Sequence, residues 1–354
     1  MEEKETLLKL VRLGVGLNPS FTNGKINWNA IKSLADEQGL SGIVLDGAEK
    51  LAEDRRPPKM MLLNWIGEVM QMESTFAHHR AVAVDMAGLF HYNAIRTYVL
   101  KGDVIAECYP KPNHRISSDL DCYLLPDKGE FNAWDLGNEL IRAKKFEVRT
   151  SFYKNSSFFL PGLMVENHQF MTPFRGNDRL ASVERVLQAL IREDDGKDIF
   201  VGTWLYRPPV MVSALFLIEH AYSHFLHEGL TWRMVLDWKM FSKKHNNDID
   251  WNTLNGYIDQ FGFRRFYDTY HRVGQYLIGE ISSNELTKAD KKMLKDIWAP
   301  LDLHETTEGW RGKFALAGNT WRARWKYRYF SEINWIKALW IQAKGVLFIK
   351  NPTI

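Results

Sequence analysis

Cysteine is scarce in this chain of 354 residues, which contains only Cys108 and Cys122. Two cysteines are too few for the disulfide framework of a secreted domain. Long apolar runs are also missing, because the most apolar stretch, residues 211–218, is far shorter than the roughly 20 residues that a membrane-spanning helix needs. The first residues, Met-Glu-Glu-Lys-Glu-Thr, are acidic where a secretion signal is basic and then apolar. We therefore expect a cytoplasmic protein.

The net charge is small, at +3, and does not by itself require a nucleic-acid partner. Its distribution is uneven, since residues 310–350 hold nine lysines or arginines and a single acid, Glu332. Hydrophobic residues make up 45% of the chain and charged residues 25%, proportions that are typical of a globular protein and exclude a disordered one. The charge pattern thus marks out a basic C-terminal segment.

The spacing of apolar residues predicts an α+β fold in which a small mixed β-sheet is flanked by helical regions. Apolar residues recur three and four apart up to about residue 93, with Asn27 as a helix cap and a long helix over 59–92. Helices return after 172, beginning with 178–192, 211–227 and 232–244. Strands are expected at 96–101, 119–125, 146–153, 157–160 and 163–168. The expected domains are a helical region over 1–93, a core over 94–172 and a helical region with a basic aromatic tail over 173–354.

Two aspartates on one predicted strand are the first candidate for chemistry. Residues two apart in a strand point to the same face, so Asp119 and Asp121 project together. Two carboxylates this close repel each other unless a cation lies between them, and hard oxygen ligands suit Mg²⁺ or Mn²⁺. The pattern predicts a divalent metal site.

A third acid, Glu166, lies on the strand predicted over 163–168. If that strand lies beside the aspartate strand, Glu166 completes a set able to hold two ions. Asp119 and Asp121 would then bind both ions, and Glu166 would hold the catalytic ion and help to deprotonate an attacking hydroxyl. Because metal ions and positioning do most of the work in phosphoryl-type transfer, no Ser-His-Asp set is required.

Residues upstream of the aspartates suit a triphosphate. A strand ends at Lys101-Gly102 and a helix follows, so the backbone can approach a phosphate at the helix N-terminus. Lys101 and Arg115 are candidate phosphate clamps, and Ser117 and Ser118 can donate hydrogen bonds beside the acids. We expect these residues to bind a nucleoside triphosphate.

The order of these motifs resembles the uncharacterised nucleotidyltransferase family of the DNA polymerase β-like superfamily. The resemblance covers about residues 25–265 and includes later segments such as His220-Ala-Tyr-Ser-His224, Trp232-Arg-Met-Val-Leu-Asp237-Trp238 and Ile249-Asp250-Trp251. Its core motifs are Leu100-Lys101-Gly102, Tyr109-Pro-Lys-Pro-Asn-His-Arg115, Asp119-Leu-Asp121 and Val165-Glu-Asn-His168. The resemblance implies a polymerase β-like core that transfers a nucleoside monophosphate (NMP) from a nucleoside triphosphate (NTP), with Mg²⁺ or Mn²⁺ as cofactor.

One departure from the family pattern leaves two interpretations open. Many superfamily members have Gly-Ser or Gly-Gly where this chain has Gly102-Asp103. An acid there either repels the triphosphate or points away and caps the following helix. The first interpretation favours a catalytically degenerate nucleotide- or partner-binding module, and the second favours an active transferase.

Several basic residues are candidate substrate contacts. His168 shares a face with Glu166 and is expected to touch substrate or to order the acid. His220 and His224 lie one helical turn apart, but no Glu follows His220, so zinc-protease chemistry is excluded. We expect these two residues to pack or to contact the acceptor, with Arg233 nearby.

The C-terminal segment mixes tryptophans with basic residues and leaves three interpretations open. It can cover the helical region with its charges in solvent, lie on an anionic membrane surface, or bind RNA by stacking and charge. Nucleic acid is the least favoured partner. The acceptor of the expected reaction is a small molecule, a sugar or a protein.

Overall fold

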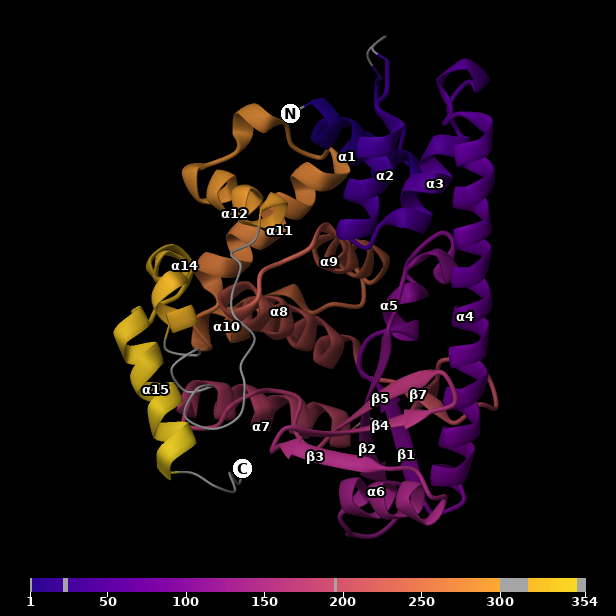
Figure 1. Cartoon of the computed structure of the whole chain (residues 1–354). Coiled ribbons are helices and arrows are strands. Elements are labelled where there is room, and N and C mark those ends of the chain that lie inside the picture. The colour runs from indigo at the N-terminus through magenta and orange to yellow at the C-terminus, as the bar shows by residue number, and fades with distance from the viewer. Residues whose placement is uncertain (1, 22–24, 194–195, 300–317, 349–354) are drawn as a thin grey trace.

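The computed structural model describes residues 2–21, 25–193, 196–299 and 318–348. Its architecture is α+β, with a mixed sheet that has helices before and after it in the chain, as the sequence predicts (Figure 1). The long helix α4 (Lys59–His91) runs along one side of the molecule, from the N-terminal helices to the sheet. This helix therefore connects the N-terminal helices to the sheet.

The N-terminal helices form where capping and apolar spacing predict them. The Asn27 side chain accepts a hydrogen bond from the Ala30 N–H and starts α2, whose Trp28 is buried. Helix α4 begins directly after Pro57-Pro58. The other helices of this region are α1 (Glu2–Gly14), α2 (Trp28–Glu37) and α3 (Ser41–Glu49), with the short 3-10 helix η1 (Glu53–Arg55).

The sheet has the strand order β3-β4-β5-β2-β1-β7-β6 within the described residues. Its central strand β2 pairs with β5 in parallel and with β1 in antiparallel orientation. The strands are β1 (Ile95–Val99), β2 (Asp119–Pro126), β3 (Val148–Phe152), β4 (Asn155–Leu160), β5 (Leu163–His168), β6 (Lys197–Asp198) and β7 (Leu205–Arg207). The strands β6 and β7 add to those expected from the sequence.

The two faces of the sheet have different partners. Helix α6 (Ala133–Ala143) packs on the face that carries Leu124, and Gly137 lies so close to this leucine that a larger residue would collide with it. The opposite face carries Asp121 and is turned toward α8 (Val210–His227), since Lys101 Nζ, an ion-pair partner of Asp121, also approaches His220 on that helix. The predicted metal-binding residue Asp121 thus lies on the face of the sheet that is turned toward α8.

Helices return after the sheet and enclose a large apolar core. Most of α8 is buried, and α9 (Trp232–Lys244) buries both of its tryptophans. None of the helices in the described residues is long and apolar enough to span a bilayer. The remaining helices are α5 (Asp103–Ala106), α7 (Asp178–Arg192), α10 (Trp251–Gln260), α11 (Arg264–Ile278), α12 (Lys288–Trp298), α14 (Arg324–Phe330) and α15 (Trp335–Phe348), with the 3-10 helices η2 (Pro112–His114) and η3 (Ser283–Glu285).

Candidate active site

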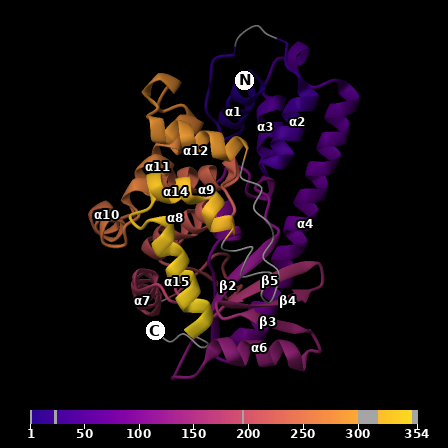
Figure 2. The same cartoon turned by 60° about the vertical axis from the view of Figure 1, so that its left-hand side comes forward.

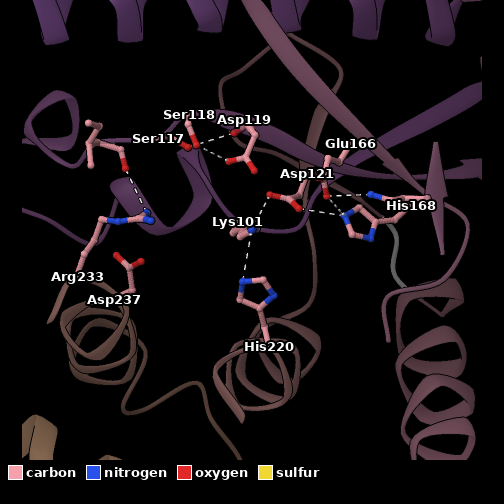
Figure 3. A network of polar contacts seen from close by, with 12 residues as sticks. Lys101, Ser117, Ser118, Asp119, Asp121, Glu166, His168, His220, Arg233 and Asp237 are labelled. Atoms are coloured by element: carbon pink, nitrogen blue, oxygen red, sulfur yellow. Dashed lines mark hydrogen bonds and ion pairs between the residues drawn. The ribbon is translucent and has the colours of Figure 1, made fainter. Parts of the chain in front are cut away.

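Strand pairing brings two of the three predicted acids side by side. In the parallel β2–β5 ladder Asp121 is the direct partner of Glu166, and Asp119 is opposite Met164. The condition that the sequence left open, adjacency of the two strands, is therefore met. Figure 3 shows Asp121 and Glu166 next to each other, with Asp119 further along the strand toward Ser118.

An imidazole completes this cluster. His168 Nε2 lies 3.0 Å from Asp121 Oδ1 and 3.6 Å from Glu166 Oε2. One ligand atom from each of these three residues lies within 4.8 Å of the others, and among the described residues Asp119 does not belong to this group. Instead, the Asp119 carboxylate accepts a hydrogen bond from Ser118 Oγ at 3.3 Å. The expected role of His168 in ordering an acid agrees with its position.

The Asp121 carboxylate has the properties of a metal ligand. It is only 2% exposed, and within the described residues its Oδ2 accepts no hydrogen bond of good geometry, although Lys101 Nζ lies 3.0 Å away. Burial opposes its ionisation, but Lys101 and His168 outweigh burial and hold the pKa of Asp121 well below its usual range. A charged, buried carboxylate with an unsatisfied oxygen beside a second carboxylate fits Mg²⁺ or Mn²⁺.

Glu166 is more accessible than Asp121 and is held from two sides. Its Oε2 accepts a hydrogen bond from Asn155 Nδ2 at 2.9 Å, and its side chain is 37% exposed. The His168 imidazole lowers the pKa of Glu166, while burial opposes this effect. Glu166 is therefore an ionised carboxylate that solvent or substrate can reach. Sequence reasoning missed Asn155, which lies between two of the expected strands.

The Lys101-Gly102 corner lies against the cluster. Lys101 Nζ is shared between Asp121 and His220, whose Nε2 is 3.4 Å away. Gly102 has φ 68° and ψ −116°, a conformation that residues with a side chain rarely adopt, and Ser117 Oγ lies 3.5 Å from the position of an added Cβ. The following helix α5 has only four residues. The expected contribution of a helix dipole is therefore small at this corner.

Asp103 has a cationic partner on the neighbouring helix α4. Its carboxylate pairs with Arg80 of α4, with Oδ2 3.7 Å from Arg80 Nε, and the same guanidinium lies 3.6 Å from Glu107. Burial raises the pKa of Asp103, and Arg80 counteracts this rise. Asp103 is thus paired with a cation from α4, and its effect on triphosphate binding stays a prediction.

Arg115 has a different partner from the phosphate that the sequence suggested. Its side chain is 3% exposed and donates two hydrogen bonds to Asp237 of α9, from Nε to Oδ1 at 3.0 Å and from Nη2 to Oδ2 at 2.7 Å. Tyr109 also donates to Asp237 Oδ1, at 2.7 Å. The remaining Nη1 donates to the Ile116 carbonyl. Because a carboxylate satisfies this guanidinium, we assign Arg115 to holding the loop before β2 in place.

Arg233 is the better-placed arginine. It is half-buried on α9, and its Nη1 donates to the Ile116 carbonyl at 3.3 Å, directly before Ser117 and Ser118. Burial and the neighbouring Arg115 lower the pKa of Arg233, whereas Asp119 is one of the acids that raise it. Figure 3 shows its guanidinium directed toward the loop that carries the two serines. Arg233 is thus a cation close to Asp119.

The serines and the histidines line the two sides of the site. Ser117 Oγ donates to the Asp119 carbonyl at 3.2 Å, so it orders the start of β2. His220 faces Lys101, and burial together with Lys101 holds the pKa of His220 well below its usual value. His224 lies one turn further along α8 and pairs with Glu228 through Nδ1 at 2.8 Å. Of the two histidines, only His220 thus contacts Lys101, the ion-pair partner of Asp121.

Comparisons with known proteins add one finding. A family model described as "uncharacterised nucleotidyltransferase" matches residues 24–278, which is more than half of the chain. No curated protein and no solved structure matches the chain. The matched segment includes β2 and β5 with their acids and the α8 and α9 residues that face them. The chain therefore belongs to the uncharacterised nucleotidyltransferase family.

Proposed function

We propose that this protein transfers NMP from an NTP to a hydroxyl group of an acceptor and releases pyrophosphate. The observation that carries the proposal is the direct pairing of Asp121 with Glu166 across two parallel strands, beside a lysine and a glycine corner. Membership of a nucleotidyltransferase family supports the same reaction class. The acceptor is a small molecule, a sugar or a protein, and the expected cytoplasmic location stays a prediction.

The acids and their neighbours take separate roles in this proposal. Mg²⁺ or Mn²⁺ bound by Asp119, Asp121 and Glu166 would supply charge that stabilises the leaving pyrophosphate and makes the acceptor hydroxyl more acidic. His168 and Asn155 keep the two paired carboxylates in place. As the acceptor oxygen bonds to the α-phosphorus, the bond from that phosphorus to the bridging oxygen breaks, and Glu166 accepts the hydroxyl proton.

The remaining residues bind the two substrates. Lys101, Gly102, Ser117, Ser118 and Arg233 surround the start of β2 and are assigned to the triphosphate, with Arg233 taking the role first expected of Arg115. The acceptor would approach from the α8 side, where His220 faces the cluster. Positioning by these groups supplies the orientation that such a reaction needs.

Nucleotide binding and turnover are the direct tests. Calorimetry with each of the four NTPs in the presence of Mg²⁺ should show binding by the parent and at least tenfold weaker binding by Asp121→Asn. Labelled NMP should transfer to components of a cell extract with the parent, and transfer should fall by two orders of magnitude or more in Glu166→Gln. Glu147→Gln, a carboxylate change at exposed residue 147 before β3, is the matched control and should behave like the parent.

Two results would contradict the proposal. Equal nucleotide binding and transfer by Asp121→Asn and the parent would remove the metal-binding role of the acidic pair. The alternative is a degenerate binding module, for which the parent is inactive. In that case Asp103→Ser should create metal-dependent transfer. Arg80 offsets part of the Asp103 charge, because the same guanidinium also lies 3.6 Å from Glu107.

A further inference from the structure

The C-terminal helices are fixed to the helical region by buried contacts. In α14, Tyr327 and Phe330 are buried, and Lys326 is fully buried while it pairs with Asp296 Oδ2 at 2.8 Å. Lys326 Nζ also donates to the Phe225 carbonyl at 2.7 Å. Because a buried charge is costly unless it is paired in this way, α14 has a defined position on the protein. The side chains that point outward from this segment therefore form a defined surface.

The outer face of α15 is apolar, although it faces solvent. Ile336 is 61% exposed and Trp340, one turn later, is 64% exposed. Ala343 continues the same exposed stripe, and the opposite face buries Ala338 and Gly345. Helices that pack on a protein normally bury their largest apolar residues; α15 packs Trp335 against the core but leaves Ile336 and Trp340 exposed. An exposed Ile–Trp stripe on a helix at the surface points to a binding partner.

Positively charged side chains lie beside this stripe. Lys337 and Lys344 are exposed on α15, and α14 exposes Arg324 and Arg328. The sequence from 318 to 348 contains a single acid, Glu332. The exposed side of the segment thus combines apolar side chains with positive charge.

Trp321 adds a second exposed aromatic residue. Its side chain is 51% exposed, and the Arg324 guanidinium lies 3.9 Å from the centre of its ring. Figure 2 shows α15 running downward from below α14 toward the C-terminus. Tryptophan with arginine or lysine at a helix surface is typical of the interface between lipid headgroups and acyl chains.

We propose that α15, together with the exposed residues beside α14, binds the surface of a bilayer that contains anionic lipids. The helix lies in the plane of the interface, with Ile336 and Trp340 inserted between headgroups and Lys337 and Lys344 close to lipid phosphates. The charge of the segment is complementary to such a surface. Its apolar stripe favours a bilayer over RNA, because Ile336 and Ala343 cannot stack on bases. This proposal does not depend on the transferase activity.

Sedimentation of the full-length protein with lipid vesicles tests the proposal. We expect the parent to bind vesicles with about one third phosphatidylglycerol and to remain in the supernatant with pure phosphatidylcholine. Trp340→Glu and Ile336→Glu should each weaken binding by roughly tenfold or more, because each replaces an apolar side chain that would be buried in the bilayer with a charged one. Lys337→Gln and Lys344→Gln should each weaken it by about fivefold, and added salt should weaken parental binding.

Matched changes on other surfaces separate this effect from a general loss of apolarity or charge. Met60→Glu changes a 69% exposed methionine on α4, and Lys144→Gln removes an exposed lysine after α6. Both should bind vesicles like the parent. All variants should keep the parental circular dichroism and melting temperature, because the altered side chains are exposed.

Several outcomes would overturn the proposal. One is the absence of parental binding to anionic vesicles, and another is unchanged binding by both Trp340→Glu and Ile336→Glu. Tighter binding of single-stranded RNA than of vesicles, lost in the same variants, would assign the surface to RNA. A parental dimer in sedimentation equilibrium that these variants dissociate would assign it to a second copy of the chain.

Discussion

A buried glutamate on α8 should make the stability of this protein depend on pH. Glu219 is 1% exposed, and its Oε1 accepts no hydrogen bond from any residue that the structure describes. Burial raises the pKa of Glu219 to about 7, with Lys154 counteracting the rise and Glu184 of α7 adding to it. Such a carboxyl keeps its proton in the folded protein at a pH where the unfolded chain has lost it.

The sign and size of the effect follow from this difference. The pKa of Glu219 is 4.5 in the unfolded reference and about 7 in the folded protein. Below pH 4.5 both states are protonated and the full contribution to stability is present. Between these values the folded state binds more protons, so the free energy of unfolding falls as pH rises, by roughly 3 kcal/mol in all. Above pH 7 this contribution is lost and the pH dependence from Glu219 ends.

Urea denaturation of the parent and of Glu219→Gln across pH 4.5 to 8 measures the effect. The neutral amide cannot ionise, so the variant should gain roughly 3 kcal/mol relative to the parent between the ends of this range. Glu139→Gln, a change at an exposed glutamate of α6, should show a constant difference from the parent. A pH-independent difference for Glu219→Gln would refute the reasoning, because it would mean that Glu219 titrates alike in both states.

Three further substitutions probe the contacts around the site. Asp237→Leu leaves the buried Arg115 guanidinium without its carboxylate and should lower the free energy of unfolding by about 3 to 5 kcal/mol in urea; a loss below 1 kcal/mol would contradict a tightly held pair. Gly102→Ala places a side chain at φ 68° and should cost about 1 to 3 kcal/mol, visible as a lower melting temperature, whereas parental stability would show that this corner is not strained. Arg80→Met removes the cation beside Asp103 and should cost about 1 to 3 kcal/mol at pH 7. Adding Asp103→Asn to Arg80→Met should recover part of that loss, and no recovery would disprove the ion pair.

Local patterns were sufficient for much of the fold. The Asn27 cap is a short-range signal that starts α2 as expected, and α4 has close to its expected bounds of 59–92. Alternation along β2 and β5 placed Asp121 and Glu166 on faces that could meet, and the resemblance to a family was confirmed. Caps, breaks and periodicity act within a few residues, so a single sequence contains them in full.

Contacts between distant segments were harder to predict. Arg115 and Asp237 are 122 residues apart, and an arginine binds a carboxylate as readily as a phosphate, so its partner depends on the tertiary fold. Strand β7 has only three residues, too few for an alternating pattern. The division into regions at 93 and 172 stays a prediction.

The position of β7 has a consequence for the association of the sheet with other chains. It pairs in parallel with β1 through Thr97–Leu205 and Tyr98–Tyr206, and so occupies one flank of a strand next to the acidic one. A fragment that stopped at residue 172 would leave the N–H and C=O groups on that flank without their partners. Unpaired flanks of this kind join to those of other chains. By pairing with β1, strand β7 thus prevents strands of other chains from adding at this flank.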